Sequence, residues 1–166
     1  MTTEPIMIRP LAYSDLPRVI AVERRAFPAP WSLAMFMLEL SKPSGVCLVA
    51  LERPGQLGAA AEPTVVGYLI CSRYADAWHL MNIAVDPPLR RRGLATALLQ
   101  AMLERGGLEE PYTLEVRPTN GPAIALYERF GFRSAGTRPR YYRDTGEDAM
   151  IMWRTAPTPS SSGAPG

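Results

Sequence analysis

A short basic turn, Arg90-Arg91-Arg92-Gly93-Leu94-Ala95, stands between an apolar run that ends at Val85 and a helical pattern that starts near Leu94. The first amides of a helix have no acceptor inside the helix, and the helix dipole adds partial positive charge at that end. Gly93 has no side chain, so a ligand can approach the backbone closely. The turn therefore predicts an anion site, and pyrophosphate is the natural ligand for it.

A second segment, residues 113–132, has the pattern of a strand followed by a short helix. Apolar and polar residues alternate from Thr113 to Arg117, as in a strand with one apolar face. Asn120 is expected to cap the helix at its N-terminus, and Gly131 is expected to end it.

Patterning along the rest of the chain predicts a mixed α/β sheet, because strands outnumber helices and alternate with them only in the middle. A helix start at residues 14–17 and an N-cap at Ser32 mark two early helices, and a loose loop is expected at 53–63. Strands are expected near 6–8, 46–51, 64–73, 77–85, 132–137 and 148–154, and helices over about 14–27, 32–40 and 91–105.

The chain has 166 residues, 47% of them hydrophobic and 20% charged, which suits one compact domain. The domain is expected over residues 1–155, followed by a disordered tail at 156–166 that is rich in Pro, Ser and Gly. A net charge of +2 does not call for nucleic acid as a partner. No segment reaches the roughly 18 apolar residues needed to cross a bilayer. These features predict a soluble cytoplasmic protein.

Cysteine and histidine usage argues against a metal site and a covalent enzyme intermediate. Cys47 and Cys71 lie in apolar strand-like runs and are expected to be buried, reduced thiols. The single histidine, His79, has no Cys or His at ligand spacing, so a zinc site is not expected. Neither cysteine lies near the two segments described above, which favours direct attack by a nucleophile from the substrate.

Together these motifs resemble the GNAT superfamily of acetyl-coenzyme A-dependent N-acetyltransferases. The resemblance rests on R-R-R-G-L-A at 90–95 and on L-E-V-R-x-x-N-x-x-A-x-x-L-Y-x-x-x-G-F from residue 114. Further motifs are similar to the bacterial RimI branch, which acetylates protein N-termini. They are N-I-A-V-D-P at 82–87, R-P-R-Y-Y at 138–142, E-D-A-x-x-M at 147–152, Phe27-Pro28 and Trp31-Ser32.

The resemblance covers roughly residues 6–154 and implies a single-domain fold. That fold is a mixed, mostly antiparallel sheet of about seven strands with about four helices, and its central strands splay at the cofactor site. It also implies acetyl-coenzyme A as the cosubstrate and no metal. The cofactor-binding residues it implies are Ile83, Ala84, Val85, Arg90, Arg91, Arg92, Gly93, Leu94, Ala95, Thr96, Asn120 and Tyr127.

Within this resemblance Glu115 is the expected general base and Tyr127 the expected general acid. A free carboxylate has a pKa near 4 and an α-ammonium a pKa near 8, so either burial raises the pKa of Glu115 or water relays the proton. The resemblance implies the water route. The competing interpretations are a salt bridge from Glu115 to Arg117 or another arginine, and an ordinary helix-face role for Tyr127 with a hydrogen-bonded hydroxyl.

The resemblance implies a protein N-terminus as substrate, usually that of a small-subunit ribosomal protein. Phe27, Trp31, Arg140, Tyr141 and Tyr142 are expected to line the groove for the peptide. A surface hairpin with aromatic packing is the alternative explanation for the tyrosine pair. A small-molecule amine or a protein lysine remains an alternative acceptor, and a coenzyme A-binding module without turnover a third hypothesis. No direct contact with nucleic acid or membrane is expected, and the chain is expected to be a monomer or weak dimer.

Overall fold

The computed structural model describes residues 6–53 and 63–155. Most of the expected 53–63 loop and the whole expected tail, 156–166, lie outside the described residues. Two short 3-10 turns, η1 at Tyr13–Asp15 and η2 at Pro87–Leu89, join the longer elements. These are β1 (Ile6–Pro10), α1 (Leu16–Ala26), α2 (Leu33–Leu40), β2 (Gly45–Glu52), β3 (Thr64–Tyr74), β4 (Ala77–Val85), α3 (Leu94–Gly106), β5 (Tyr112–Val116), α4 (Gly121–Arg129), β6 (Arg133–Arg138) and β7 (Ala149–Arg154).

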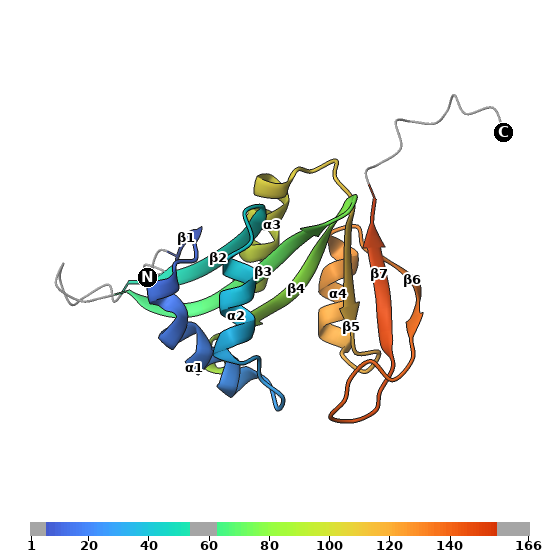
Figure 1. The fold of residues 1–166 in the computed structure, drawn as a ribbon, viewed down its shortest axis with the longest axis horizontal. Coiled ribbons are helices and arrows are strands. Elements are labelled where there is room, and N and C mark those ends of the chain that lie inside the picture. Colours follow the sequence, from blue (N-terminus) through green and yellow to red (C-terminus); the bar gives the residue numbers. More distant parts are fainter. Residues whose placement is uncertain (1–5, 54–62, 156–166) are drawn as a thin grey trace. The chain divides into compact units, whose positions relative to one another are not determined.

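The strands form one sheet in the order β1-β2-β3-β4-β5-β7-β6 (Figure 1). The pairs β1-β2, β2-β3, β5-β7 and β6-β7 are antiparallel. The predicted fold class, an α/β fold with a mostly antiparallel sheet of seven strands and four helices, is confirmed for the described residues. The chain forms two compact units: the first holds the described residues up to Ser72 and Leu80–Arg105, and the second holds Arg73–His79 and those from Gly106 onward.

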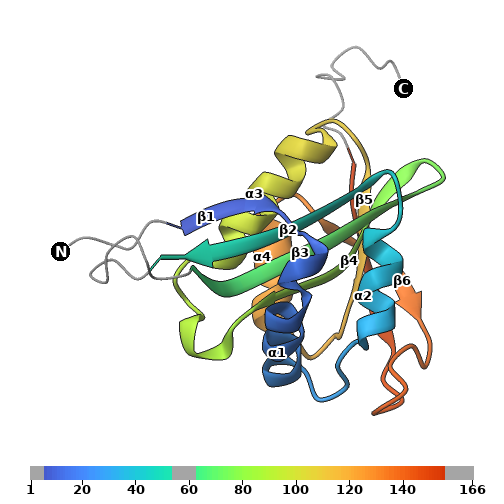
Figure 2. The same cartoon turned by 60° about the vertical axis from the view of Figure 1, so that its left-hand side comes forward.

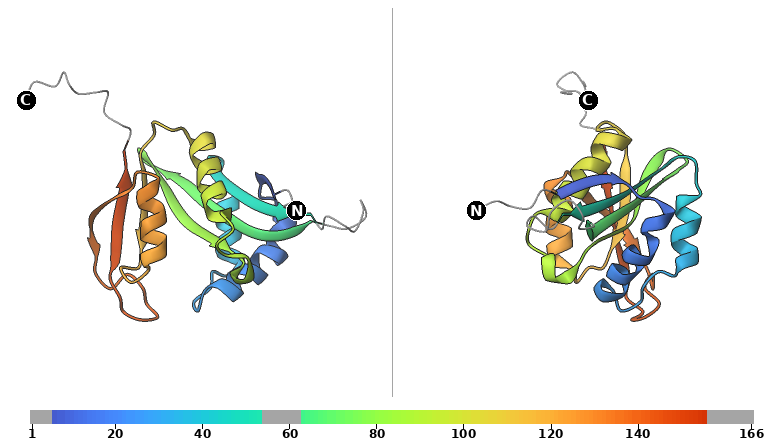
Figure 3. Two further views of the ribbon diagram at one scale, coloured as in Figure 1. Left: turned by 180° about the vertical axis from the view of Figure 1, so that it is seen from behind. Right: turned by 90° about the vertical axis from the view of Figure 1, so that its left-hand side faces the viewer.

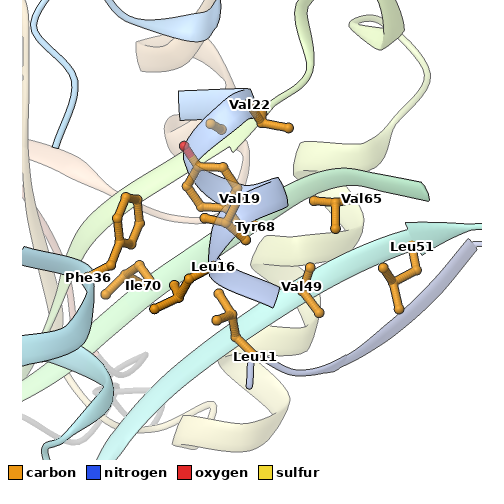
Figure 4. Close-up of a cluster of buried hydrophobic side chains, with 11 residues drawn as sticks. Leu11, Leu16, Val19, Val22, Phe36, Val49, Leu51, Val65, Tyr68 and Ile70 are labelled. Carbon is orange, nitrogen blue, oxygen red and sulfur yellow. The ribbon is translucent and has the colours of Figure 1, made fainter. Parts of the chain in front are cut away.

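In the first unit, helices cover both faces of the strands. Helices α1 and α2 lie on one face of β2, β3 and β4, and α3 lies on the other (Figures 2 and 3). Figure 4 shows the core between α1, α2 and the sheet, where apolar side chains from each element meet. Its buried members are Leu11, Leu16, Val19, Val22, Phe36, Val49, Leu51, Val65, Tyr68, Ile70 and Ala84. Burial of this one face anchors both helices to the sheet.

A bulge in β3 sets the position where β4 ends. Ala50 pairs with Gly67 and Leu51 with Val65, so Val66 is an extra residue in β3. The Val66 carbonyl accepts a hydrogen bond of 2.8 Å from the amide of Asp86, the first residue after β4. A Cβ atom on Gly67 would lie 2.8 Å from the carbonyl oxygen of Ala84. Glycine at this position therefore permits the close approach of β3 to the end of β4.

Helix α3 begins at Leu94, three residues after the start expected at Arg91. Arg91 and Gly93 have φ angles of 70° and 76°, in the left-handed region, so they cannot belong to a right-handed helix. The helix ends at Gly106, as expected from the Gly106-Gly107 pair, and Gly107 has a φ of 111°. The N-cap expected at Ser32 is confirmed, since its side chain accepts a hydrogen bond from the amide of Met35.

In the second unit, β7 pairs with both β5 and β6, and the amide of Trp78 donates to the carbonyl of Pro111 at 2.9 Å. Helix α4 is capped at Asn120, whose Oδ1 accepts from the Ala123 amide at 3.2 Å, as expected. Gly131 follows the helix with a φ of 95°, also as expected. The expected strands at 132–137 and 148–154 are β6 and β7, each starting one residue later.

Candidate active site

The basic turn before α3 has the features of an anion site within the first unit. The first backbone hydrogen bond of the helix runs from the Ala97 amide to the Gly93 carbonyl at 3.0 Å. The amides of residues 94–96 therefore have no acceptor inside the helix and can donate to a ligand at its N-terminus. Gly93 is exposed, and a Cβ atom built on it would meet nothing within 4 Å. The turn therefore has open space beside a row of helix-terminal amides.

The three arginines of the turn are exposed, but their environments differ. Arg92 donates to the Glu52 carboxylate of β2 at 2.5 Å, which neutralises part of its charge. Arg90 and Arg91 have no side-chain partner among the described residues. These two arginines are thus the ones whose charge can reinforce anion binding at the turn.

Ile83, Ala84 and Val85 form the end of β4, as expected for a strand that leads into the turn. Ala84 is buried in the core, and Ile83 and Val85 are half-buried. Their side chains pack while the backbone continues to Asp86, which forms a bidentate ion pair with Arg25 at 2.9–3.0 Å. This ion pair and the β3 bulge together fix the path of the chain into the turn.

Tyr127 is buried on α4, 7% exposed, and its ring packs edge-on against Phe132 at 5.9 Å. Within the described residues its hydroxyl has no hydrogen-bond partner, so the alternative of a hydrogen-bonded helix-face tyrosine has no support there. Burial, and the neighbouring Tyr142, raise the pKa of Tyr127 above its ordinary value. A buried hydroxyl without a partner is costly and fits a group whose partner is a ligand.

Glu115 lies on β5 with its side chain only 5% exposed, between two cationic groups of the second unit. Its Oε1 lies 2.6 Å from His79 Nε2, and its Oε2 lies 3.1 Å from Arg138 Nε. Burial alone would raise the pKa of Glu115, but the hydrogen bonds and charges of His79 and Arg138 outweigh it and hold the pKa below its ordinary value. The route in which burial raises this pKa is therefore wrong.

The arginine that pairs with Glu115 is Arg138, not Arg117. Arg117 instead binds the Asp144 carboxylate through both oxygens, at 2.9–3.0 Å, and Glu147 at 2.9 Å. His79 is the residue that sequence reasoning missed at this site. The signal that could have found it is its position as one of two polar residues, with Asn82, in the mostly apolar strand β4.

The loop between β6 and β7 carries Arg140, Tyr141 and Tyr142. The two tyrosine rings pack edge-on with centroids 5.0 Å apart, as the hairpin alternative expected. Burial and the charge of Glu115 raise the pKa of Tyr141, so Tyr141 also faces the carboxylate. Burial raises the pKa of Tyr142 to about 12. Aromatic packing and proximity to Glu115 therefore coexist in this loop.

Phe27 and Trp31 of the first unit follow α1 and pack, partly buried, against the hydrophobic core. The Trp31 amide donates to the buried carboxylate of Glu23 at 2.8 Å, and Asn82 Nδ2 donates to the same carboxylate at 2.9 Å. Tyr68 also donates to Glu23. Glu23 thus fastens the segment after α1 to strands β3 and β4.

The predicted site residues fall into two groups by unit. The end of β4, the basic turn, Phe27 and Trp31 belong to the first unit, whereas Glu115, Asn120, Tyr127 and the Arg140–Tyr142 loop belong to the second. Among the described residues no cluster of three or more His, Cys, Asp or Glu side chains could hold a metal ion. No helix in the described ranges is long and apolar enough to cross a membrane.

Both cysteines are free thiols, as expected, but only Cys71 is buried, whereas Cys47, the third residue of β2, is half-buried. Burial raises the pKa of Cys47 to about 11 and raises that of Cys71 further. Thiols held in the protonated form are poor nucleophiles.

The sequence profile of the Acetyltransferase (GNAT) family matches residues 16–132. The N-alpha-acetyltransferase RimI of Mycobacterium tuberculosis is 36% identical over 166 residues, which covers 95% of this chain and 98% of that protein. An uncharacterized protein of Mycobacterium leprae is 39% identical over 159 residues, and this chain spans only 42% of its length.

Among solved structures, the ribosomal-protein-S18-alanine N-acetyltransferase from Escherichia coli matches with a TM-score of 0.77 and 34% identity. The match covers 95% of this chain and 98% of that one.

Proposed function

The chain belongs to the GNAT acetyltransferase family, and on that premise we propose that it transfers the acetyl group of acetyl-coenzyme A to the N-terminal α-amine of a protein. Two relatives support an α-amine as acceptor. One is named an N-alpha-acetyltransferase, and the other is named for the alanine of ribosomal protein S18. A small-subunit ribosomal protein is the proposed substrate, and such a substrate would place the reaction in the cytoplasm.

The observation that carries the proposal is the turn at residues 90–96, with Gly93 in a left-handed conformation and the helix amides unpaired beyond it. Amides at a helix N-terminus bind phosphate oxygens through hydrogen bonds and the helix dipole. The proposed ligands of the pyrophosphate are the amides of residues 91–96, reinforced by Arg90 and Arg91. The backbone of residues 83–85 and Asn120 are proposed to hold the pantetheine arm.

The proposed chemistry is direct attack by the amine on the thioester carbonyl. The carboxylate site at Glu115 would receive the proton of the substrate ammonium, and Tyr127 would give a proton to the departing thiolate. An acyl-enzyme intermediate is not part of the proposal, because burial raises the pKa values of both Cys47 and Cys71. The proposed domain comprises residues 1–155, and the proposed oligomeric state is a monomer or weak dimer.

An α-amine is a chemically suitable acceptor because its pKa of about 8 lies roughly two units below that of lysine. The loop with Arg140 and the paired tyrosines, and the segment with Phe27 and Trp31, are proposed to bind the first residues of the peptide. Arg138 and Arg140 bring positive charge to this region, which disfavours a polyamine as the acceptor.

Mass spectrometry on short peptides incubated with acetyl-coenzyme A tests the proposal. The panel should contain matched pairs: a peptide with a free N-terminus and no lysine, and the same peptide with a blocked N-terminus and one internal lysine. We expect acetylation of the first and not of the second. Acetylation of the blocked peptide alone, or of a free polyamine alone, would contradict the proposal.

A further inference from the structure

His79 and Glu115 form a pair of imidazole and carboxylate inside the second unit. Their closest atoms, His79 Nε2 and Glu115 Oε1, lie 2.6 Å apart. The His79 side chain is 22% exposed and the Glu115 side chain only 5% exposed. The imidazole is therefore the member of the pair that solvent or a substrate reaches more easily, while the carboxylate lies behind it.

The hydrogen bond determines which nitrogen of His79 carries the proton. An ionised carboxylate has only acceptors, so Nε2 must donate to Oε1. In the neutral ring Nδ1 then keeps its lone pair, and among the described residues Nδ1 has no hydrogen-bond partner. A histidine oriented by a carboxylate through one nitrogen, with the other nitrogen free, is the arrangement that makes imidazole an effective general base.

We infer that His79, held by Glu115, takes the proton from the substrate ammonium. The inference rests on the proposed function and refines the role of the carboxylate. An imidazole ordinarily has a pKa near 6.5 and a carboxylate one near 4, so the imidazole is closer by about two units to an α-ammonium near 8. Glu115 becomes a positioning residue that fixes the ring and stabilises its positive charge after proton transfer.

The proton and bond balance of the reaction is complete with these residues. One N–H bond of the ammonium breaks and an Nδ1–H bond forms on His79. The amine nitrogen bonds to the carbonyl carbon, and the C–S bond breaks. Tyr127 protonates the sulfur and regains a proton from the second N–H of the former ammonium. His79 releases its proton to water, so one proton is released for each amide formed.

Charged and titratable groups around the pair come from three other elements. The ring of Tyr74, on β3, lies edge-on to the His79 ring with centroids 6.0 Å apart. Arg138, on β6, contacts the second oxygen of Glu115 at 3.1 Å. Tyr141, in the loop after β6, faces the same carboxylate. The pH profile of a His79 variant must therefore be compared with that of a variant in which one of these neighbouring groups alone is changed.

The test compares the pH dependence of kcat for the wild type and His79→Gln, at saturating acetyl-coenzyme A and peptide. Glutamine keeps an N–H donor for Glu115 but does not titrate. We expect the rise of kcat through the range of an imidazole to disappear and kcat at neutral pH to fall about 10²-fold, the lower end of general-base effects. Affinity for acetyl-coenzyme A should not change. A profile like that of the wild type would overturn the inference.

Tyr74→Phe serves as the matched control, since it keeps the ring beside His79 and should keep the wild-type profile. If the wild type acetylates no peptide, the proposed function fails rather than the pairing. The pairing then has its own readout, because His79 is the single histidine and its ring nitrogens give one set of NMR signals that identify the tautomer. In the wild type we expect the proton of the neutral ring on Nε2, where it donates to Glu115. A neutral ring with its proton on Nδ1 would overturn the inference independently of turnover.

Discussion

The guanidinium of Arg117 lies over the ring of Tyr142, with its central carbon 3.9 Å from the ring centroid. The same guanidinium binds Asp144 and Glu147 in the loop that follows Tyr142. The loop also closes on itself, because the Tyr142 amide donates to the Glu147 carbonyl and the Gly146 amide donates to the Tyr142 carbonyl. One side chain at the end of β5 therefore holds the loop that carries the proposed peptide-binding tyrosines.

Arg117→Lys should weaken peptide binding more than it slows the chemical step. Lysine keeps the charge but cannot bind a carboxylate through two nitrogens while stacking on a ring. Loss of about 1.4 kcal/mol of loop stabilisation corresponds to a tenfold change in an equilibrium. Steady-state kinetics should show a KM for peptide about tenfold higher, with kcat and acetyl-coenzyme A affinity within about twofold of wild type. A fall in kcat with unchanged KM would argue against this role.

Tyr127→Phe should lower kcat by about 10²- to 10⁴-fold and leave acetyl-coenzyme A affinity nearly unchanged, because it removes only the proton donor. Tyr112→Phe is a suitable control: Tyr112 is also a buried tyrosine of the second unit, but its hydroxyl donates to the Gly107 carbonyl at 2.9 Å. The control should lose stability and keep its turnover. Unchanged turnover in Tyr127→Phe would remove the assignment of this residue as the acid.

Local signals in the sequence were enough to predict the helices and strands. Ser32 and Asn120 cap their helices as expected, because an N-cap is decided by residues within one turn. The start of α3 was placed three residues early, because the arginines before Gly93 are compatible with helix by propensity. The left-handed φ of Arg91 depends on how the turn joins β4, and composition does not reveal that.

The partners of Glu115 could not be predicted in the same way, because they come from distant positions. His79 is 36 residues away in sequence. Pairing it with Glu115 requires knowing that β4 and β5 are neighbours in the sheet. From the sequence, the partner of Glu115 could be Arg117 or another arginine, and nothing singled out Arg138. Arg117 is not the partner because it binds the carboxylates of Asp144 and Glu147, which lie in the loop before β7.

Asp15→Asn should destabilise the protein at neutral pH and flatten the acid limb of its stability curve. Asp15 is buried, and its bidentate hydrogen bond to Arg9, at 2.8–2.9 Å, holds its pKa below the ordinary value. A lowered pKa in the folded state gives stability that is present above the unfolded pKa and is lost as pH falls through the folded one. That window opens near pH 4 and extends downward.

Thermal unfolding from pH 7 to pH 2 measures this effect. The variant should lose about 1–3 kcal/mol at pH 7, the range for hydrogen bonds to charged groups, and its Tm should fall less than that of the wild type below pH 4. Asp76→Asn, in the exposed turn before β4, is the control and should follow the wild-type curve. Parallel curves for Asp15→Asn and wild type would contradict the prediction.

Gly93→Ala should weaken acetyl-coenzyme A binding, because a φ of 76° is unfavourable for any residue with a Cβ atom. The left-handed conformation costs roughly 1–2 kcal/mol for an L-residue, and relaxing that strain would turn the amides of residues 94–96 away from the pyrophosphate. Calorimetry should show a Kd higher by about 5- to 30-fold.

Gly146→Ala supplies a close match for the backbone strain, since Gly146 has a φ of 74° and likewise has nothing within 4 Å of an added Cβ atom. Both variants should lose similar stability, but only Gly93→Ala should lose affinity for acetyl-coenzyme A. Equal affinity in the two variants would mean that the pyrophosphate is bound elsewhere.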